Sequence, residues 1–177
     1  MWNVGSLLGL CLIRQILRGI FLTFYFKARL FESFNSVVHL MNDVSRGWVI
    51  RFTHSTGASF FFILCYAHVG KALFYSSFYF WKVWASGLII ILFLIIEAFL
   101  GYVLPWGQIS FWGATVITNL ISVIPYAGQF IVEWLWGGFN VSEPTLIRFF
   151  SFHFLIPFIL VSIVVAHIFF TPRNGVF

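Results

Sequence analysis

The sequence predicts an all-α membrane protein, a bundle of four transmembrane helices that run up, down, up and down. Three observations predict this class. Hydrophobic residues make up 61% of the 177 residues, charged residues make up only 8%, and the apolar residues gather in runs long enough to cross a bilayer. A soluble domain of this length could not bury so much apolar surface, so the composition excludes a soluble protein.

Each predicted span has about 20 apolar residues or more, the length that a helix needs to cross a hydrocarbon core about 30 Å thick. The spans cover residues 3–26, 48–75, 82–104 and 144–170, within a single transmembrane domain of residues 1–177. A short connection containing Tyr79 and Phe80 predicts that the second and third spans are antiparallel neighbours. Four spans place both termini on the same side of the membrane.

The connections between the spans predict what lies at the membrane surface. The stretch 105–143 is too apolar for a water-exposed linker and is rich in Trp and Tyr, which predicts short helices along the surface that cover a ligand pocket. The link 27–47 carries most of the polar residues of the first half. The net charge is +5, but the basic residues are scattered, so we expect lipid headgroups or anionic ligand groups as partners and no nucleic acid.

Four histidines recur at one interval. The second span contains His54 and His68, the fourth contains His153 and His167, and both pairs are 14 residues apart. Fourteen residues make nearly four helical turns, so the two side chains of a pair lie within about 40° of the same face and about 21 Å apart along the axis. Two helices with such pairs can hold two planar metallocofactors stacked across the membrane.

The first and third spans repeat this interval with glycine. A porphyrin between four helices needs two helices that donate imidazoles and two that approach its edge closely, and glycine leaves room for that approach. In an up-down-up-down bundle the eight residues form two levels. One level contains Gly5, His68, Gly87 and His167, and the other contains Gly19, His54, Gly101 and His153.

Paired histidines predict the chemistry of the cofactor. Two axial imidazoles leave a haem iron no open position, so such a haem transfers electrons and binds no oxygen. Each imidazole should direct its other N–H at a backbone carbonyl or a hydroxyl, and Ser55, Thr56 and Ser151 are nearby candidates. His39 has no partner at the interval and is not expected to be a ligand. An alternative of another class is a transporter that uses buried histidines as a proton relay.

Basic side chains close to the histidines could bind the haem propionates. Arg51 and Arg148 precede the first histidine of each pair by three and five residues, and Lys71 follows His68 by three. Arginine suits a carboxylate because its guanidinium can bind both oxygens. The alternative for each is a long side chain that extends from a helix end toward the membrane surface.

Several runs of residues carry a resemblance to a known family. They are Trp-Asn-Val-Gly-Ser-Leu-Leu-Gly from Trp2, Gly-Ala-Ser-Phe-Phe-Phe from Gly57, Ala-His-Val-Gly-Lys from Ala67, Gly-Tyr-Val-Leu-Pro-Trp-Gly-Gln-Ile-Ser-Phe-Trp-Gly-Ala-Thr-Val-Ile-Thr-Asn-Leu from Gly101, and Arg-Phe-Phe-Ser-Phe-His-Phe-Leu-Ile-Pro-Phe from Arg148. In these runs the sequence resembles cytochrome b of the mitochondrial and bacterial cytochrome bc1 complex (complex III), over essentially the whole chain.

The resemblance implies two haem b groups. It assigns His54 and His153 to the low-potential haem, and His68 and His167 to the high-potential haem. It also implies that the first haem contacts Gln15 and Arg51, and the second Trp2, Ser6, Lys71 and Trp84. In the chloroplast-type haem subunit of plastoquinol–plastocyanin reductase the second histidine pair is one residue further apart, so the spacing here favours the respiratory type.

The activity that the resemblance implies is that of a quinol–cytochrome c reductase. Quinol is oxidised at one membrane face, electrons cross both haems, quinone is reduced at the other face, and protons are translocated. Residues that match the lining of the quinol-oxidation pocket are Phe99, Tyr102, Gly113 and Ile117. The implied setting is the mitochondrial inner membrane, with ubiquinone as substrate, and the implied partners are the Rieske iron–sulfur protein, cytochrome c1 and other complex III subunits in a dimeric complex.

Two features depart from the family pattern. The sequence lacks the later helices of the family and their Pro-Glu-Trp-Tyr motif, so we expect a second chain to supply them, or an incomplete copy, and no complete quinol site on this chain alone. Pro172 stands where the family usually has a histidine of the quinone-reduction site.

Charged residues within the spans are a further departure. Arg14 and Arg18 lie in the first span and Glu97 lies in the third. An unpaired charge inside the bilayer costs at least about 3 kcal/mol. We therefore expect an ion pair between Arg14 and Glu97, or between Arg18 and Glu97.

Overall fold

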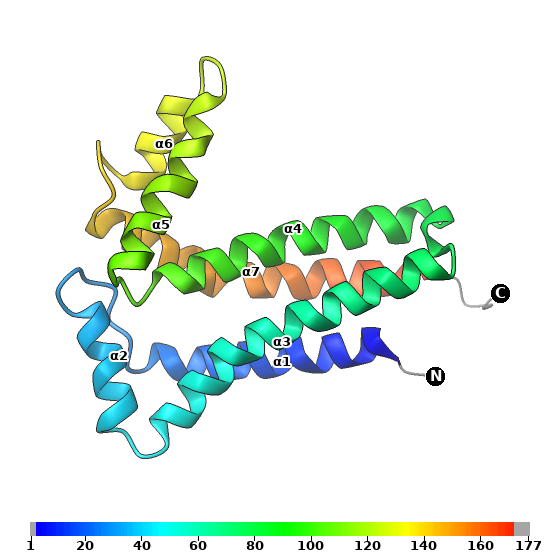
Figure 1. Ribbon diagram of the computed structural model, residues 1–177, viewed down its shortest axis with the longest axis horizontal. Helices are drawn as coiled ribbons and strands as arrows, with labels where there is room; N and C mark the ends of the chain where they lie inside the picture. Colours follow the sequence, from blue (N-terminus) through cyan, green and yellow to red (C-terminus); the bar gives the residue numbers. More distant parts are fainter. Residues whose placement is uncertain (1–2, 172–177) are drawn as a thin grey trace.

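Four long helices form an antiparallel bundle in the computed structural model, which describes residues 3–171. They are α1 (Val4–Thr23), α3 (Gly47–Phe74), α4 (Trp81–Val103) and α7 (Glu143–Phe169). Each is long and apolar enough to cross a membrane. Both ends of the described chain lie at the same end of the bundle (Figure 1). Within residues 3–171 there is no strand, so the predicted all-α, four-span class is confirmed.

The bundle consists of two helix pairs. α1 packs chiefly on α3, and α4 packs chiefly on α7, with one pair above the other in Figure 1. α3 and α4 are antiparallel and joined by the short η1 (Ser77–Tyr79), but each has its main packing with another helix. The two helices are antiparallel as predicted, and the space that the site occupies separates the α1–α3 pair from the α4–α7 pair.

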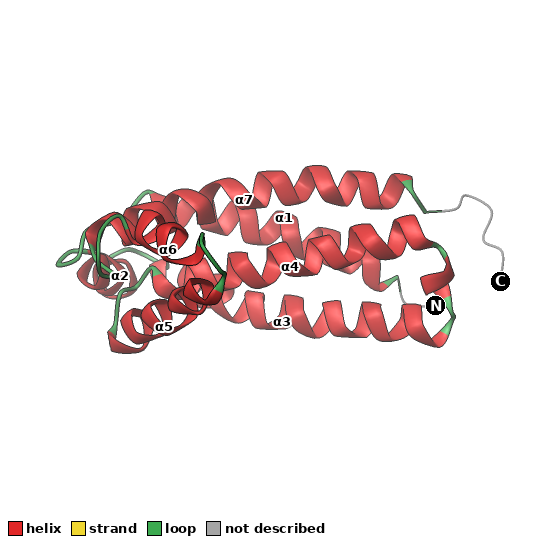
Figure 2. Cartoon of the chain, turned by 90° about the horizontal axis from the view of Figure 1, so that it is seen from above, coloured by secondary structure: helices red, strands yellow, loops and turns green. Residues whose placement is uncertain are grey.

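Shorter helices cap the end of the bundle that lies away from the termini (Figure 2). They are α2 (Ser33–Asn42), α5 (Gln108–Asn119), η2 (Leu120–Val123) and α6 (Gly128–Trp136). α5 and α6 are steeply inclined to the long axis of the bundle (Figure 1). Helices in this direction lie along the surface of a membrane that the bundle crosses. Short helices within 105–143 were predicted and are present. α2 was not predicted, because the polar residues of the link 27–47 masked its small buried face.

Three side chains attach the α5–α6 hairpin to the start of α7. The indole N–H of Trp136 donates to Oγ1 of Thr118 at 2.6 Å, and Oγ1 of Thr145 donates to the carbonyl of Trp136 at 2.8 Å. Thr118 is 2% exposed and Thr145 is fully buried. Buried polar groups need such partners, so these bonds fix the direction in which the hairpin leaves the bundle.

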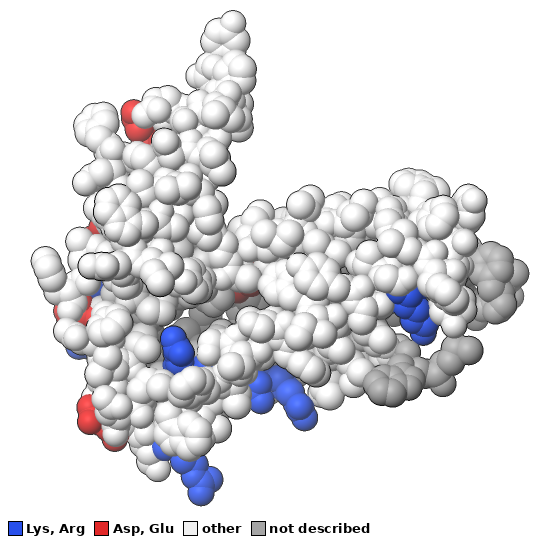
Figure 3. Space-filling view, viewed as in Figure 1, with Lys and Arg blue, Asp and Glu red and all other residues white. Residues whose placement is uncertain are grey.

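The surface of the bundle is apolar. Large hydrophobic side chains are exposed along all four long helices, and Figure 3 shows charged side chains only at separate places on this face, with no continuous basic patch. Such a surface suits contact with lipid tails or with apolar faces of other proteins.

Candidate cofactor site

The four histidines of the repeated interval face one another in two pairs across the space between the helix pairs. The ring centroids of His54 and His153 lie 6.2 Å apart, and those of His68 and His167 lie 6.4 Å apart. A metal–imidazole bond of about 2.0 Å, together with the radius of each ring, places two opposite ligands of one metal with their centroids about 6 Å apart. Both pairs therefore have the spacing of two axial ligands of a single metal atom.

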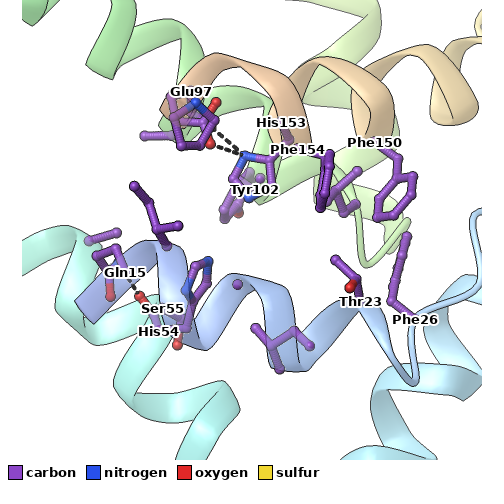
Figure 4. Close-up of a pocket in the computed structure, with 18 of the residues that line it drawn as sticks. Gln15, Thr23, Phe26, His54, Ser55, Glu97, Tyr102, Phe150, His153 and Phe154 are labelled. Atoms are coloured by element: carbon purple, nitrogen blue, oxygen red, sulfur yellow. Dashed lines mark hydrogen bonds and ion pairs between the residues drawn. The ribbon is translucent and has the colours of Figure 1, made fainter. Parts of the chain in front are cut away.

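A cavity of about 590 Å³ lies between the helix pairs at the level of His54 and His153. Both imidazoles point into it from opposite sides (Figure 4). Its other lining residues are mainly apolar and come from all four long helices, with a few from α2, α5 and the adjoining links. The volume falls within the range of about 300–1,000 Å³ that is typical of ligand and cofactor pockets.

Glycines lie behind the histidines at this level. A Cβ atom placed on Gly101 would lie 2.5 Å from Cε1 of His153, and a Cβ atom on Gly19 would lie 3.3 Å from Cε1 of His54. Each imidazole therefore lies against the glycine of the helix that packs on its own helix. A larger residue at Gly101 would displace the ring.

The second level repeats this arrangement nearer the termini. A Cβ atom on Gly5 would lie 3.3 Å from Cε1 of His68, and one on Gly87 would lie 3.2 Å from Cε1 of His167. The structure thus brings together the same two sets of four residues that the interval predicts, one set at each level.

Hydrogen bonds to Nδ1 orient two of the four rings. Nδ1 of His167 lies 2.8 Å from the hydroxyl of Ser86. That hydroxyl donates its proton to the carbonyls of Lys82 and Val83, so it accepts the N–H of the imidazole. Nδ1–H of His153 donates to Glu97, to the carboxylate at 2.8 Å and to the backbone carbonyl at 3.1 Å. A proton on Nδ1 leaves Nε2 free to bind a metal.

The hydroxyl of Ser86 and the carbonyl of Glu97 are partners of the predicted kind, but the carboxylate of Glu97 is not. The residues named for this role are wrong. Ser55 and Thr56 donate to the carbonyl of Phe52 on their own helix, and Ser151 donates to the carbonyl of Ile147. A signal was present in the sequence. Ser86 directly precedes Gly87, and Glu97 lies one helical turn before Gly101.

The predicted ion pair of Glu97 with Arg14 or Arg18 is also wrong. Glu97 contacts His153, Arg18 donates to the carbonyl of Thr53 at 3.1 Å, and Arg14 is exposed. The physical reason is the pairing of the helices. α1 and α4 belong to different pairs, and the side chain of Glu97 is directed toward α7.

The residues predicted to contact a haem at the level of His54 and His153 do not all lie at the cavity. Gln15 and Arg51 line the cavity, and the amide of Gln15 donates to the carbonyl of His54 at 2.8 Å. Arg148 instead donates to the carbonyl of Trp134 and lies over the ring of that residue, 5.6 Å from its centroid. It faces α6 and is not among the residues that line the cavity.

The predicted contacts at the second level lie near the ends of the helices. The backbone N–H of Ser6 donates to Asn3 at the start of α1, Lys71 lies in the last turn of α3, and Trp84 contacts Phe78 edge to face. Trp2 and Pro172 lie outside the described residues.

The residues matched to a quinol pocket are not all brought together. Tyr102 lines the cavity, whereas Phe99 packs against Phe149 with the ring centroids 5.7 Å apart. Gly113 and Ile117 lie on α5, where a Cβ atom on Gly113 would meet nothing within 4 Å and Ile117 is 49% exposed.

The residues present fit a haem. Nδ1 of His54 and Oε1 of Gln15 are buried at the cavity without a hydrogen-bond partner among the described residues. Across the same part of the chain no group of three or more His, Cys, Asp and Glu side chains could hold a metal ion. A macrocycle would supply the other ligands of a metal between two histidines, and the cavity lies between His54 and His153.

Comparisons with known proteins decide the family. The family model described as cytochrome b/b6/petB matches residues 1–175. The chain belongs to the cytochrome b family. Membership in the cytochrome b family implies haem b binding, and the four candidate spans make this cytochrome b a multi-pass membrane protein.

A solved structure shares the fold of this cytochrome b. A chain of the structure described as "Hyperthermophilic respiratory Complex III" is 32% identical and superposes with a TM-score of 0.85. The match covers 99% of this chain and 49% of that chain. This cytochrome b thus spans about half the length of that relative.

Proposed function

We propose that this chain is the dihaem electron-transfer subunit of a respiratory quinol–cytochrome c reductase. The observation that carries the proposal is the two histidine pairs, 6.2 and 6.4 Å apart across the space between the helix pairs. His54 and His153 hold the low-potential haem b, and His68 and His167 hold the high-potential haem b.

The residues around the histidines prepare the site for electron transfer. A haem held between these paired imidazoles would supply one-electron transfer and would bind no oxygen. Ser86 and Glu97 fix the rings of His167 and His153, and this orientation keeps Nε2 free. The mainly apolar lining limits water, and Arg51 at the cavity suits a propionate.

The separation of the two histidine levels along the helix axis supports electron transfer across the membrane. Fourteen residues of helix separate the two levels by about 21 Å, so one level lies toward each membrane face. We infer that electrons from quinol oxidation at one face pass through both levels to quinone at the other, with protons released and taken up on opposite sides. The position of Tyr102 at the cavity supports quinol oxidation at the end that α2, α5 and α6 cap.

This chain spans about half the length of the similar complex III chain, and in this proposal the quinol site includes residues beyond this half. The further partners are the Rieske iron–sulfur protein, cytochrome c1 and other complex III subunits in a dimer. The respiratory membrane is the setting, and the mitochondrial inner membrane with ubiquinone is the form that the sequence resemblance favours.

Two alternatives make different predictions. A chloroplast-type haem subunit is disfavoured by the equal spacing of the two histidine pairs, and it would carry a covalently bound third haem. A histidine-relay transporter would have no visible haem absorbance. Both alternatives are distinguished from the proposal by optical spectroscopy.

The deciding experiment is the difference spectrum, dithionite-reduced minus oxidised, of the purified membrane complex. Haem is quantified as pyridine haemochrome and this chain by mass spectrometry. We expect two b haems per chain, one lost in His54→Ala and the other in His68→Ala. His39→Ala should keep both, because His39 lies on α2, away from the site, and forms a hydrogen bond with Asp43 just after that helix. One haem or none in the wild type would contradict the proposal.

A further inference from the structure

A carboxylate lies inside the membrane-spanning part of α4. The side chain of Glu97 is 13% exposed, it lines the cavity, and its Oε2 is buried without a hydrogen-bond partner among the described residues. A charged side chain at such a depth is costly and marks function more often than structure.

Glu97 lies directly behind one histidine. Oε1 accepts the Nδ1–H of His153 at 2.8 Å, and the carbonyl of Glu97 lies 3.1 Å from the same nitrogen; Figure 4 shows both bonds from α4 to the ring. The corresponding partner at the other level is neutral, the hydroxyl of Ser86 at 2.8 Å from Nδ1 of His167. The two levels therefore differ in the charge behind the ligand that α7 supplies.

We infer that Glu97 is a positioning residue that lowers the reduction potential of the haem held by His153 below that of the haem held by His167. The inference rests on the proposed function. A carboxylate that accepts Nδ1–H strengthens Nε2 as a donor to the metal. Its negative charge, in surroundings of low dielectric constant, also favours the oxidised iron, which carries one more positive charge than the reduced iron.

This difference gives electron transfer a direction. Electrons flow from the couple of lower potential to that of higher potential, so an electron that enters at the His153 level passes to the His167 level. A substitution that removes the charge of Glu97 but keeps its shape should reduce the difference in reduction potential between the two haems.

The test is a potentiometric titration of the purified complex carrying Glu97→Gln, which keeps a hydrogen-bond acceptor and removes the charge. We expect both haems to be retained and the potential of the His153 haem to rise, by about tenfold in its reduction equilibrium, or 59 mV for a one-electron couple. The other haem should be unchanged. The matched control is Glu133→Gln on α6, where the carboxylate accepts from Gln129 near the surface, and it should shift neither potential.

Failure of the inference and failure of the proposed function give different results. Two haems per chain with both potentials unchanged in Glu97→Gln would overturn the inference and leave the dihaem function standing. A wild-type complex without two b haems would overturn the function itself.

A measurement on the wild type covers the case in which Glu97→Gln does not retain its haem. The near-infrared charge-transfer band of oxidised bis-imidazole haem, seen by magnetic circular dichroism, depends on the donor strength of the axial ligands. We expect two bands, with the one from the low-potential haem displaced in the direction of a stronger donor. A single band at the position of neutral imidazole ligands would overturn the inference.

Discussion

His153 approaches its neighbouring helix more closely than the other three histidines approach theirs. A Cβ atom on Gly101 would lie 2.5 Å from Cε1 of His153, shorter than any ordinary contact, so Gly101→Ala must displace the ring. We expect the affinity of that level for haem to fall about 10–100-fold and the haem content to fall from two per chain toward one. Pyridine haemochrome quantification of the purified complex measures the loss.

The control for this substitution lies on α3. A Cβ atom on Gly70 would meet nothing within 4 Å, so Gly70→Ala should keep both haems. If Gly101→Ala also kept two haems with an unaltered spectrum, the close approach of α4 to the ring would have no role in binding.

A surface carboxyl in the link before α2 responds to pH in a defined direction. The Nζ of Lys27 lies 2.9 Å from Oε2 of Glu32, and this hydrogen bond and charge hold the pKa of the Glu32 carboxyl below its usual 4.5. A pKa lowered by folding means that the pair stabilises the link above about pH 4.5, and that the stabilisation is lost as pH falls through the folded pKa.

Removal of the cation should therefore raise this pKa. In Lys27→Met we expect the pKa of Glu32 to move toward 4.5, read by NMR titration of carbon-13-labelled glutamate in the detergent-solubilised complex. Salt should weaken the effect in the wild type, because the pair is exposed. Arg46→Met serves as the comparison, and an equal shift in that variant would mean that net charge, not the pair, sets the pKa.

The relative positions of site residues were predictable when both residues lie on the same helix. The interval of 14 residues places His54 and His68 on one face of α3 whatever surrounds them. The partners of Nδ1 were not predictable from the same helix, because they come from the helix that packs against it. Glu97 was assigned to an arginine on α1 for this reason, although it lies beside His153 on α7.

Among the elements, the α5–α6 hairpin depends on two buried hydroxyls. Thr118→Val keeps the shape of the side chain but leaves the indole N–H of Trp136 without its acceptor, which lies at 2.6 Å in the wild type. A buried donor without a partner costs about 1–3 kcal/mol. We expect faster limited proteolysis in the 105–143 stretch.

The matched substitution on the same helix is Thr115→Val. Oγ1 of Thr115 donates only to the carbonyl of Phe111 on α5 itself, at 2.9 Å, so its removal should leave the cleavage rate close to that of the wild type. Equal rates in Thr118→Val and Thr115→Val would mean that the bond to Trp136 does not hold the hairpin.

Long apolar elements were predictable and their contacts were not. Length and hydropathy predicted the four spans to within a few residues, and the apolar composition of 105–143 predicted short helices. The short η1 connection predicted that α3 and α4 are antiparallel neighbours, and they are antiparallel, but each packs chiefly on another helix. Loop length constrains where two helix ends meet, but it does not decide which faces pack along the rest of their length.

At the scale of the whole molecule, our proposal implies that the bound cofactor holds the two helix pairs together. Because α1 packs chiefly on α3 and α4 on α7, few direct contacts join the pairs. Binding to the folded state alone stabilises a protein by about 2.7 kcal/mol at a ligand concentration 100 times Kd. We expect chain made under haem depletion to be cleaved faster by protease, and haem supplied during synthesis to restore resistance. Equal cleavage with and without haem would contradict this role.

The division into two helix pairs also sets an order of events during synthesis. α1 and α3 can pack together once residue 74 has emerged, and at that stage each level has one imidazole, from α3. The opposing imidazoles at both levels come from α7, the last of the four long helices to be synthesised. Biogenesis therefore has a checkpoint: a nascent chain that stops before α7 can pack its first half but cannot complete either pair of histidines, and both pairs are completed in the same step.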